Sequence, residues 1–368
     1  MEIVQVVGSY PPHPGGEELV AERLALLQAE DHDVTVYTSD RGRGTALRHD
    51  RDGRLEVFRD FSVAVGNTPV VPGLLWRLLR HRPRPDVVHV HAGVALTPEV
   101  VRLATRLRGV PYVAHLHLMV RPSSRAGSAL LPLYQRTFYA GFLRGAARVV
   151  CLTNAMRDDV VATFGVSPER VTVVPNGVDV ELFRPGTPAR RARPELLFVG
   201  RLTAQKNVML TVEAMRLLPT DVTLRIVGTG ELHDALARRI ADLGLHNVRL
   251  EGQLSPAELA DRYRCADAVL MPSTHEGFPL VLLEAMASGA PVICSALPEL
   301  VEAGGDAVLA IENPTAQSLA AAVRQVLADG PRRARLAVAA RRRAAGFGWP
   351  AVARAVDDVY RSVRAERA

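Results

Sequence analysis

Short apolar runs and helix-like apolar stripes alternate along the first half of the chain. The β-branched run EIVQVV is followed by the Pro/Gly-rich loop GSYPPHPGG and by a stretch that places Leu19, Leu24 and Leu27 on one helical face. The strand-like runs DVTVYTS, DVVHVH, PYVAHLHL, ARVVCLT and RVTVVPNGVD continue the series, with helical patterns near residues 99–107 and 134–143. This alternation predicts an α/β domain with a parallel sheet.

A second series of the same kind follows a break in the pattern. Residues 184–194, RPGTPARRARP, have no apolar periodicity and are rich in proline and arginine, which is typical of a linker. The runs ELLFVG, TLRIVG, NVRLEG, AVLMPS and PVICS then alternate with helical stretches. Because 368 residues are enough for two cores, we predict two α/β domains, residues 1–184 and 185–349.

The last segment, FGWPAVARAVDDVYRSVRAERA, has the pattern of an amphipathic helix. Pro350 suits the first helical turn, and Val352, Val356, Val359 and Val363 share one face. We therefore predict a helix over residues 350–368 that needs a partner surface.

Composition narrows the class of protein. Apolar residues make up 48% and charged residues 23%, as in folded globular chains, and no apolar run approaches the ~20 residues of a membrane span. The N-terminus shows neither a basic region nor a cleavage site, so we expect a cytoplasmic location. Cys151, Cys265 and Cys294 are widely spaced in apolar surroundings and are expected to be buried thiols.

Basic residues point to anionic partners. The net charge is +6, but the arginines follow helical patterns and aromatic residues are only 5%, so we expect phosphorylated small molecules rather than nucleic acid. Lys206 is the only lysine among the 45 basic residues. It lies with Arg201 in GRLTAQKN, directly after the strand-like ELLFV, where parallel sheets bind ligands. The pair suits a phosphate; the alternative is a solvated surface pair.

A second anion-binding element is indicated by STHEGFPLVLLEAMASGAPV. Pro279 suits the first turn of a helix that Gly289 ends, and the N–H groups at a helix start attract an anion. Glu276 precedes this helix and Glu284 lies within it. A carboxylate would repel a phosphate, so both are expected to face hydroxyl groups of a sugar or ribose. The alternative for Glu284 is a solvent-facing position.

Two further loops contain paired glycines. Gly15 and Gly16 in YPPHPGGEE precede a helix and would let a ligand approach the backbone closely. VGTGE contains Gly228 and Gly230, but His233 stands where a dinucleotide fingerprint needs its third glycine. We interpret VGTGE as a turn at a strand end.

Histidines occur in pairs on two strand-like runs. His89 and His91 form HVH, His115 and His117 form HLH, and a period of two places each pair on one face of a sheet. Four imidazoles could bind zinc, but no acidic motif accompanies them, and we predict instead one histidine that acts on a substrate. The acidic pairs in DHD and DRD are three-residue matches to a metal motif and are not assigned to a metal.

Taken in order, these motifs resemble those of the retaining glycosyltransferases of family 4, which have the GT-B fold. The matching segments, PPHPGGEE, DHDVTVYT, HVH, VPYVAHLH, VVPNGVD, VGRLTAQKN, IVGTGE and EGFPLVLLEAMASGAPVI, span essentially the whole chain. The resemblance implies two Rossmann-like domains whose parallel sheets face a central cleft. Residues 1–184 would bind the acceptor, with helix 350–368 crossing back to them, and residues 185–349 would bind the nucleotide-sugar donor.

The resemblance also assigns roles to residues. Arg201 and Lys206 would hold the diphosphate, Glu284 the ribose hydroxyls and Glu276 the donor sugar, while His117 would act near the anomeric centre. The other implied donor contacts are Gly15, Gly16, Gly200, Gly228, Leu254, Gly277, Phe278, Pro279, Leu280 and Val281. Leu118 stands where the family often has an acidic residue, so Arg121 and Arg125 are expected to serve the acceptor. His13 and His91 are the remaining acceptor candidates.

The implied reaction moves a hexose or N-acetylhexosamine, with retention, to a hydroxyl of a small-molecule, secondary-metabolite or lipid-linked acceptor. UDP-sugars such as UDP-GlcNAc or UDP-glucose are the favoured donors, and no metal or cofactor is expected. One alternative is a GDP-mannose-dependent mannosyltransferase; another is a non-transferring epimerase or binding protein of the same fold. LLPLYQRTFYAGFLRGAARVV is either a peripheral membrane contact or a buried helix.

Overall fold

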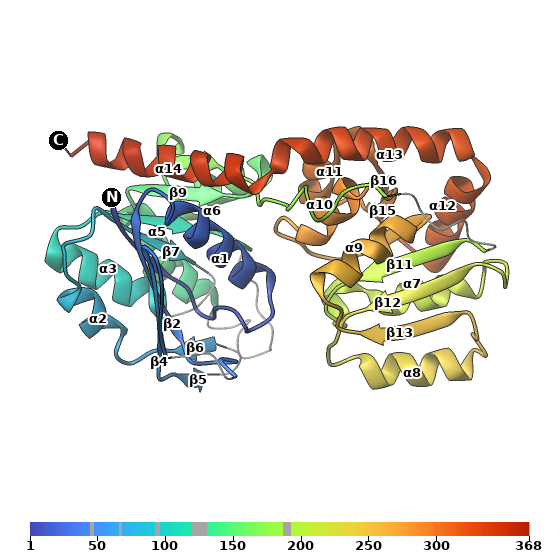
Figure 1. The fold of residues 1–368 in the computed structure, drawn as a ribbon, viewed down its shortest axis with the longest axis horizontal. Helices are drawn as coiled ribbons and strands as arrows, with labels where there is room; N and C mark the ends of the chain where they lie inside the picture. Colours follow the sequence, from blue (N-terminus) through green and yellow to red (C-terminus); the bar gives the residue numbers. More distant parts are fainter. Residues whose placement is uncertain (45–47, 66–67, 93–95, 119–130, 187–192, 368) are drawn as a thin grey trace. The chain divides into compact units, whose positions relative to one another are not determined.

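The computed structural model describes residues 1–44, 48–65, 68–92, 96–118, 131–186 and 193–367. It divides the chain into two compact units (Figure 1). Unit 1 consists of Met1–Asn176 and Trp349–Ala368, and unit 2 of Gly177–Gly348.

The division falls before the Pro/Arg-rich segment because residues 177–184 pack on unit 2. The Val178 N–H donates to the Phe347 carbonyl at 2.8 Å. The Arg264 guanidinium donates to the carbonyls of Leu182 and Arg184 at 2.8 and 2.9 Å. The predicted boundary at residue 184 therefore lies inside unit 2, a few residues beyond the start of that unit.

Unit 1 contains an eight-stranded sheet with the order β10-β9-β8-β7-β1-β2-β4-β3, in which only the β3–β4 pair is antiparallel. A separate hairpin consists of β5 and β6. The strands are β1 (Glu2–Val6), β2 (Asp33–Ser39), β3 (His49–Asp52), β4 (Leu55–Asp60), β5 (Val63–Val65), β6 (Thr68–Val70), β7 (Val87–His91), β8 (Tyr112–His115), β9 (Arg148–Cys151) and β10 (Val171–Val173).

The helices of unit 1 include one from the end of the chain. They are α1 (Gly16–Gln28), α2 (Leu74–Arg80), α3 (Thr97–Arg108), the π-helix η1 (Gln135–Tyr139), α5 (Ala140–Gly145), α6 (Asn154–Phe164), the 3₁₀ turn η2 (Pro168–Arg170) and α14 (Trp349–Ala365). In α14, Val352, Val356, Val359 and Val363 are all buried, as the apolar stripe predicted, and the helix packs against α1 (Figure 1).

Unit 2 contains a six-stranded parallel sheet with the order β13-β12-β11-β14-β15-β16. Its strands are β11 (Glu195–Val199), β12 (Thr223–Val227), β13 (Val248–Gly252), β14 (Ala268–Met271), β15 (Val292–Ser295) and β16 (Val308–Ile311). Its helices are η3 (Ala204–Lys206), α7 (Val208–Met215), α8 (His233–Asp242), α9 (Pro256–Cys265), α10 (Leu280–Ala287), α11 (Pro298–Gly304), η4 (Gly305–Ala307), α12 (Ala316–Ala328), α13 (Gly330–Ala344) and η5 (Ala345–Phe347).

Three sequence expectations about burial can be compared with the structure. Cys151 and Cys294 are buried, but Cys265 is only partly buried because it ends α9 close to the surface. Residues 135–145 form η1 and α5, in which Tyr139 and Leu143 are buried but Phe138 is exposed, so the segment is only partly a buried helix. Among the described residues, no helix combines the length and the apolar composition needed to cross a membrane.

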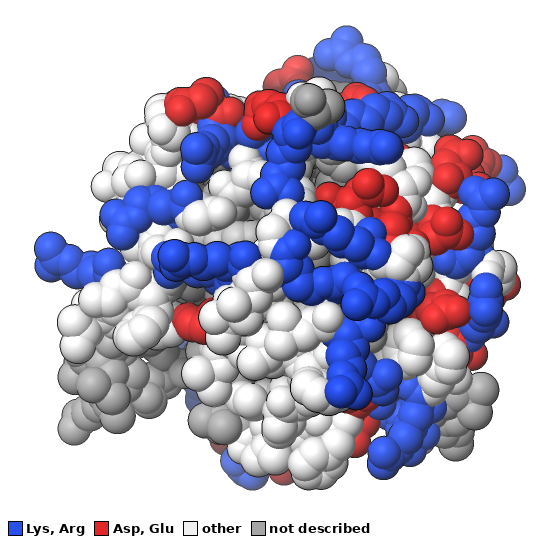
Figure 2. All heavy atoms as spheres, turned by 90° about the vertical axis from the view of Figure 1, so that its left-hand side faces the viewer, with Lys and Arg blue, Asp and Glu red and all other residues white. Residues whose placement is uncertain are grey.

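Lys and Arg side chains gather on the face of the molecule shown in Figure 2. Several of the arginines of unit 1 have structural roles at the end of α3. Arg84 and Arg367 each donate to the Gly109 carbonyl, at 2.7 and 2.8 Å, and Arg108 donates to the carbonyls of Leu78 and His81. Cationic side chains favour the carbonyl end of a helix, so part of the positive charge stabilises the fold itself.

Candidate functional site

The candidate donor site lies at the point where the strand order of unit 2 reverses. From β11 the chain proceeds to β12 and β13 on one side of the sheet, and then returns to place β14 on the other side of β11. In open parallel sheets the loops after the two central strands diverge at such a point and leave a crevice for ligands. Here these loops are residues 200–207 and 272–279, which contain Arg201, Lys206 and Glu276.

The loop after β11 has a defined shape. Gly200 has a φ of +153° and Asn207 a φ of +52°, which are backbone conformations that glycine and, less often, asparagine tolerate. Between them η3 forms a single 3₁₀ turn, and Asn207 precedes the first residue of α7. The side chain of Arg201 is exposed, whereas Lys206 is partly buried.

Hydrogen bonds join this loop to the loop after β14. The Thr274 N–H donates to the Gln205 carbonyl at 2.9 Å, and the Gln205 amide donates to the His275 carbonyl at 2.8 Å. The two segments are about 70 residues apart in the sequence, yet one backbone hydrogen bond and one from the Gln205 side chain hold them together. Their charged side chains are consequently held in one place.

Lys206 and Glu276 form a bidentate ion pair. The Lys206 ammonium donates to both carboxylate oxygens of Glu276 at 2.7 Å, and the Glu276 side chain is only 4% exposed. An ammonium has three N–H donors, so one remains for a further anion. A planar guanidinium would direct its donors differently, which gives a physical reason for a lysine at this position. The structure thus joins two residues that the sequence analysis had assigned to separate contacts.

Helix α10 begins beside this ion pair. Pro279 is its N-cap, so the helix starts one residue later than we predicted, and it ends before Gly289, whose φ is +76°. The ψ of 126° at Pro279 is extended rather than helical, which explains the shift. The first N–H groups of a helix have no partner within it, and the positive end of the helix dipole favours an anion there. The ring of Phe278 is buried and packs edge-on against Phe347.

Gly228 is a structural glycine that supports the loop after β11. Its φ is +137°, and a Cβ at this position would lie 2.0 Å from the Gly200 carbonyl oxygen. A Cβ on Gly230 would similarly lie 2.5 Å from the Leu202 carbonyl oxygen. VGTGE is a turn at the end of β12, as we expected, and its glycines allow the loop with Arg201 and Lys206 to pack directly on it.

Glu284 on α10 is partly buried and hydrogen-bonded rather than exposed. Its carboxylate accepts a hydrogen bond from the Tyr263 hydroxyl of α9 at 2.9 Å. Burial raises the pKa of Glu284 to about 7, although the Tyr263 hydroxyl opposes this shift. The carboxyl therefore titrates near neutral pH. Tyr263 was missed by sequence reasoning, because nothing in its local pattern separates it from an ordinary core tyrosine.

We expect nucleotide binding to depend on this titration. The ionised carboxylate can accept hydrogen bonds from Tyr263 and from ribose hydroxyls, so affinity for a nucleotide should rise about tenfold between about pH 6 and about pH 8. Glu284→Gln should remove the dependence, and Tyr263→Phe should move its midpoint to higher pH. Calorimetric titration with UDP measures both effects, with the exposed Glu312→Gln as control. A pH-independent affinity in the unmodified protein would contradict this role.

Unit 1 has its own reversal of strand order, between β1 and β7. The loop after β1 contains His13, whose Nδ1 lies 3.1 Å from the Glu18 carboxylate, and Gly15, the N-cap of α1. Gly16 is the first residue of α1 and is exposed. These positions agree with a ligand-binding loop, and the assigned contacts remain predictions.

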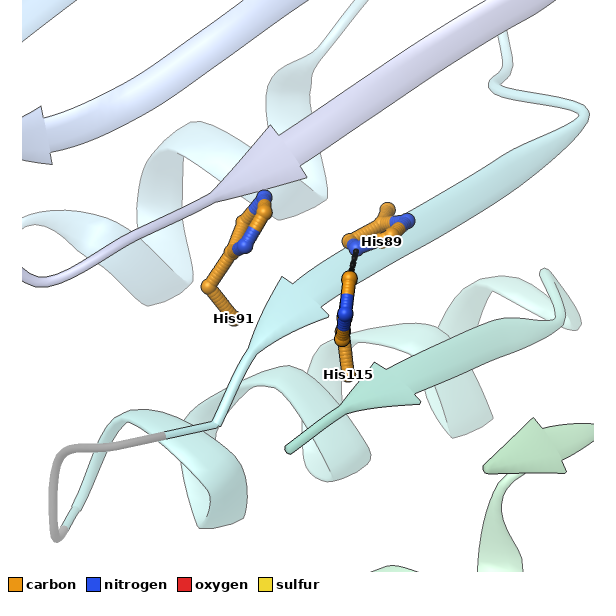
Figure 3. A group of neighbouring side chains, drawn as sticks. All are labelled: His89, His91 and His115. Atoms are coloured by element: carbon orange, nitrogen blue, oxygen red, sulfur yellow. Dashed lines mark hydrogen bonds between the residues drawn. The ribbon is translucent and has the colours of Figure 1, made fainter. Parts of the chain in front are cut away.

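The four histidines form one cluster at the carboxyl end of the unit 1 strands, in which His89, His91 and His115 are buried and His117 is partly buried. His91 and His115 are register partners on β7 and β8. Nε2 of His89 lies 3.2 Å from Nδ1 of His115, a contact that is dashed in Figure 3. Nδ1 of His91 lies 2.8 Å from Nε2 of His117. His117 is more exposed than His115, and its assignment to the substrate stays a prediction.

Burial keeps this cluster uncharged. Desolvation lowers the pKa of His89 and of His117 to about 3, and the pKa values of His91 and His115 also fall well below the usual value. Three of the rings, on His89, His91 and His115, place ligand atoms within 4.8 Å of one another and could approach a metal ion (Figure 3). However, most of their ring nitrogens are already hydrogen-bonded, so the arrangement fits a network of neutral imidazoles better than a zinc site.

Glu17 was also missed by the sequence analysis. It lies in the first turn of α1, where desolvation, with the neighbouring Glu18 as a lesser cause, raises its pKa to about 8. Acidic residues are common in a first helical turn, so the sequence carries no signal of this shift. The group is mostly protonated at neutral pH.

We expect Glu17 to make stability depend on pH. Because its pKa is higher in the folded than in the unfolded chain, the contribution is complete at acid pH and is lost as the pH rises toward 8. The free energy of unfolding should fall by about 2 kcal/mol between about pH 6 and about pH 8. Glu17→Gln should flatten this decline in urea denaturation measured at both pH values. An equal decline in the variant would contradict the assignment.

Three other residues were predicted to belong to the site, Leu254, Arg121 and Arg125. Arg121 and Arg125 lie outside the described residues. Leu254 follows β13 and is partly buried. Their assignments stay predictions.

The sequence of the chain matches two family models and several curated proteins. The family model "Glycosyltransferase Family 4" matches residues 14–182, and "Glycosyl transferases group 1" matches residues 179–343. The chain is 35% identical to the D-inositol 3-phosphate glycosyltransferase of Kineococcus radiotolerans, over 90% of this chain and 84% of that protein. It is 33% identical to the glycogen synthase of Mycobacterium tuberculosis, over 95% and 82%.

The fold is also similar to solved structures. The crystal structure of Anabaena Alr3699/HepE in complex with UDP and glucose has a TM-score of 0.79 at 20% identity, covering 97% of this chain and 98% of that one. The chain therefore belongs to glycosyltransferase family 4, and it has the GT-B fold.

Proposed function

We propose that the protein transfers a hexosyl or N-acetylhexosaminyl group from a UDP-sugar to a hydroxyl group, with retention of configuration. The observation that carries this proposal is the Lys206–Glu276 pair at the start of α10, at the point where the strand order of unit 2 reverses. A cation and a helix start in one place suit a diphosphate.

The proposed chemistry needs little from the protein besides electrostatic stabilisation. The acceptor hydroxyl forms a bond to the anomeric carbon on the face from which the diphosphate departs, and the departing phosphate oxygen takes the hydroxyl proton. Arg201, Lys206 and the N–H groups of Leu280 and Val281 stabilise the negative charge that develops on that phosphate. Glu276 orients the ammonium and contacts the sugar.

The choice of substrates rests on similarity. The Anabaena structure holds UDP and glucose, which favours UDP-glucose or UDP-GlcNAc over GDP-mannose. Several relatives are named for D-inositol 3-phosphate, which favours a small polyol acceptor. Inositol phosphates are accordingly the first acceptors to try, ahead of lipid-linked ones.

The experiment is product analysis with a matrix of donors and acceptors. The purified protein is incubated with UDP-, GDP- and ADP-sugars, each with and without inositol phosphates and other polyols. An α-linked product from an α-linked UDP-sugar, formed only when the acceptor is present, is the expected result. Epimerised sugar without an acceptor, or no turnover with the whole panel, would contradict the proposal.

A chelator provides a second test. If Arg201 and Lys206 neutralise the diphosphate, EDTA should change the initial rate less than about twofold, because fixed cations replace the Lewis acid. The rate is measured before and after chelation and again after Mg²⁺ is restored. Strict dependence on Mg²⁺ would show that the charge balance of the site needs a metal.

A further inference from the structure

A chain of buried hydrogen bonds connects the C-terminal helix to the histidine assigned to the sugar. The Gln28 amide N–H donates to Asp357 of α14 at 3.0 Å, and the Gln5 amide N–H donates to the Gln28 oxygen at 2.9 Å. The Gln5 oxygen lies 3.3 Å from Nε2 of His91, and Nδ1 of His91 lies 2.8 Å from Nε2 of His117. The chain joins side chains 329 residues apart in the sequence.

The chain has a direction, because its first member can only accept. A carboxylate has no N–H or O–H to donate, so the Asp357 oxygen requires the NH₂ group of Gln28. The Gln28 oxygen then faces Gln5 and requires the NH₂ group of Gln5. The Gln5 oxygen in turn requires a proton on Nε2 of His91. Each amide thus donates toward Asp357 and accepts from the side of His91.

The polarity determines the tautomer of both histidines. A neutral imidazole carries one N–H and one bare nitrogen. With its proton on Nε2, His91 has a bare Nδ1, which must accept from Nε2–H of His117. His117 is then left with a bare Nδ1, and this buried atom has no hydrogen-bond partner among the residues that the structure describes. A bare nitrogen of this kind accepts a hydrogen bond from a hydroxyl group.

We propose that Asp357, Gln28 and Gln5 are positioning residues that hold His117 as the Nε2–H tautomer, with Nδ1 offered to a hydroxyl of the transferred sugar. The contact between Nδ1 and the sugar rests on the proposed function, whereas the assignment of the tautomer follows from the hydrogen bonds alone. A neutral acceptor suits a sugar hydroxyl and would repel a carboxylate at the same position. The hydrogen-bonded chain from Asp357 to His117, called the relay below, therefore favours neutral hexoses over uronic acids.

A second contact supports the role of α14. The Tyr360 hydroxyl lies 2.5 Å from Nδ1 of His89, one helical turn beyond Asp357, and His89 contacts His115. Asp357 is 9% exposed and Tyr360 1% exposed. An amphipathic helix needs only its apolar stripe to pack, so two polar side chains directed into the sheet require another explanation. Attachment to the histidine cluster supplies one.

The direct test is ¹⁵N NMR of histidine-labelled protein without ligand, with the His117 signals assigned from a His117→Asn sample. We expect Nδ1 of His117 to have the chemical shift of a bare, pyridine-type nitrogen and Nε2 that of an N–H nitrogen. The opposite pattern in the unmodified protein would overturn the relay and leave the proposed function standing. The expected pattern in a protein that forms no glycosyl product would overturn the proposed function and leave the relay standing.

Variants test whether the relay sets the tautomer. Gln5→Leu removes the acceptor of His91 and should move both His117 signals toward the averaged values of mixed tautomers. Its kcat should fall about tenfold, the loss of one neutral hydrogen bond, with the KM for the donor nearly unchanged. Asp357→Asn should shift the His117 signals and lower kcat in the same direction but less strongly. Because Asp357 lies on the more accessible α14, this variant provides the test if Gln5→Leu does not fold.

The matched control is Asp358→Asn. Asp358 is the next residue of α14, is exposed, and pairs with Arg361 rather than with Gln28. It should leave the His117 signals and kcat unchanged. Equal effects of Asp357→Asn and Asp358→Asn, or a loss of kcat in Gln5→Leu without any change in the His117 signals, would overturn the proposal.

Discussion

Lys206→Met is expected to lower kcat/KM by about 10²- to 10³-fold, the usual loss when one preorganised donor to a developing negative charge is removed. The ammonium holds both oxygens of Glu276 and has one donor left for the diphosphate. Lys206→Arg should not restore activity, because the donors of a guanidinium are fixed in one plane and cannot turn toward Glu276 and toward a phosphate that lies outside that plane. Steady-state kinetics with the best donor and acceptor measures the loss.

Lys206→Met leaves the buried Glu276 carboxylate without its partner, so the variant needs a control for stability. Removing one member of a buried ion pair leaves an uncompensated charge and destabilises the fold by about 3–5 kcal/mol. The double variant Lys206→Met/Glu276→Gln removes both charges and should recover much of that stability without recovering activity. Arg216→Ala, at the end of α7, is the exposed control and should be active. Near-normal activity of Lys206→Met would contradict the role given to the ammonium.

Gly228→Ala is expected to destabilise unit 2 by about 4 kcal/mol or more, because overpacking and backbone strain are among the few causes of losses of this size. The added Cβ would lie 2.0 Å from the Gly200 carbonyl oxygen, and Gly200 cannot retreat easily because its N–H donates to the Val227 carbonyl at 3.0 Å. The loop with Arg201 and Lys206 would therefore be displaced. We expect UDP binding to be lost with the stability.

Gly244→Ala is the control that separates the steric clash of an added Cβ from the cost of a positive φ. Gly244 also has a positive φ, +63°, but nothing lies within 4 Å of a Cβ at that position, so the cost should be about 1–2 kcal/mol. Both tryptophans, Trp76 and Trp349, belong to unit 1. Urea unfolding followed by tryptophan fluorescence should thus change little in Gly228→Ala, while circular dichroism should reveal early unfolding. Equal losses in the two variants would contradict the steric argument.

The sequence predicts the large elements of the fold because their patterns are local. The strands β1 and β7 are rich in β-branched residues, β11 is a short apolar run that a glycine follows, and α14 has a four-valine stripe; all are observed. The edge strand β3, HDRD, was not predicted, because it is fully exposed and has no apolar alternation. The short hairpin of β5 and β6 likewise gave no clear pattern.

For the candidate site, the sequence identifies charged residues but not their partners. Arg201, Lys206, Glu276 and Glu284 were found because each stands in an unusual local setting, a strand end or an apolar helix. The pairing of Lys206 with Glu276 depends on which strands are neighbours, and sheet order is not a local property. The partners Tyr263, Gln5, Gln28 and Asp357 have ordinary local patterns, so only the folded chain reveals them.

If Arg201, Lys206 and the start of α10 bind a diphosphate, the affinities for UDP and for uridine must differ, and calorimetric titration with both ligands measures this difference. We expect UDP to bind at least about 100-fold more tightly than uridine, a difference of about 2.7 kcal/mol for the phosphates. Arg201→Ala/Lys206→Met should remove most of this difference while uridine binding stays unchanged. Equal affinities for UDP and uridine in the unmodified protein, or an undiminished preference for UDP in the double variant, would show that these groups do not bind the diphosphate.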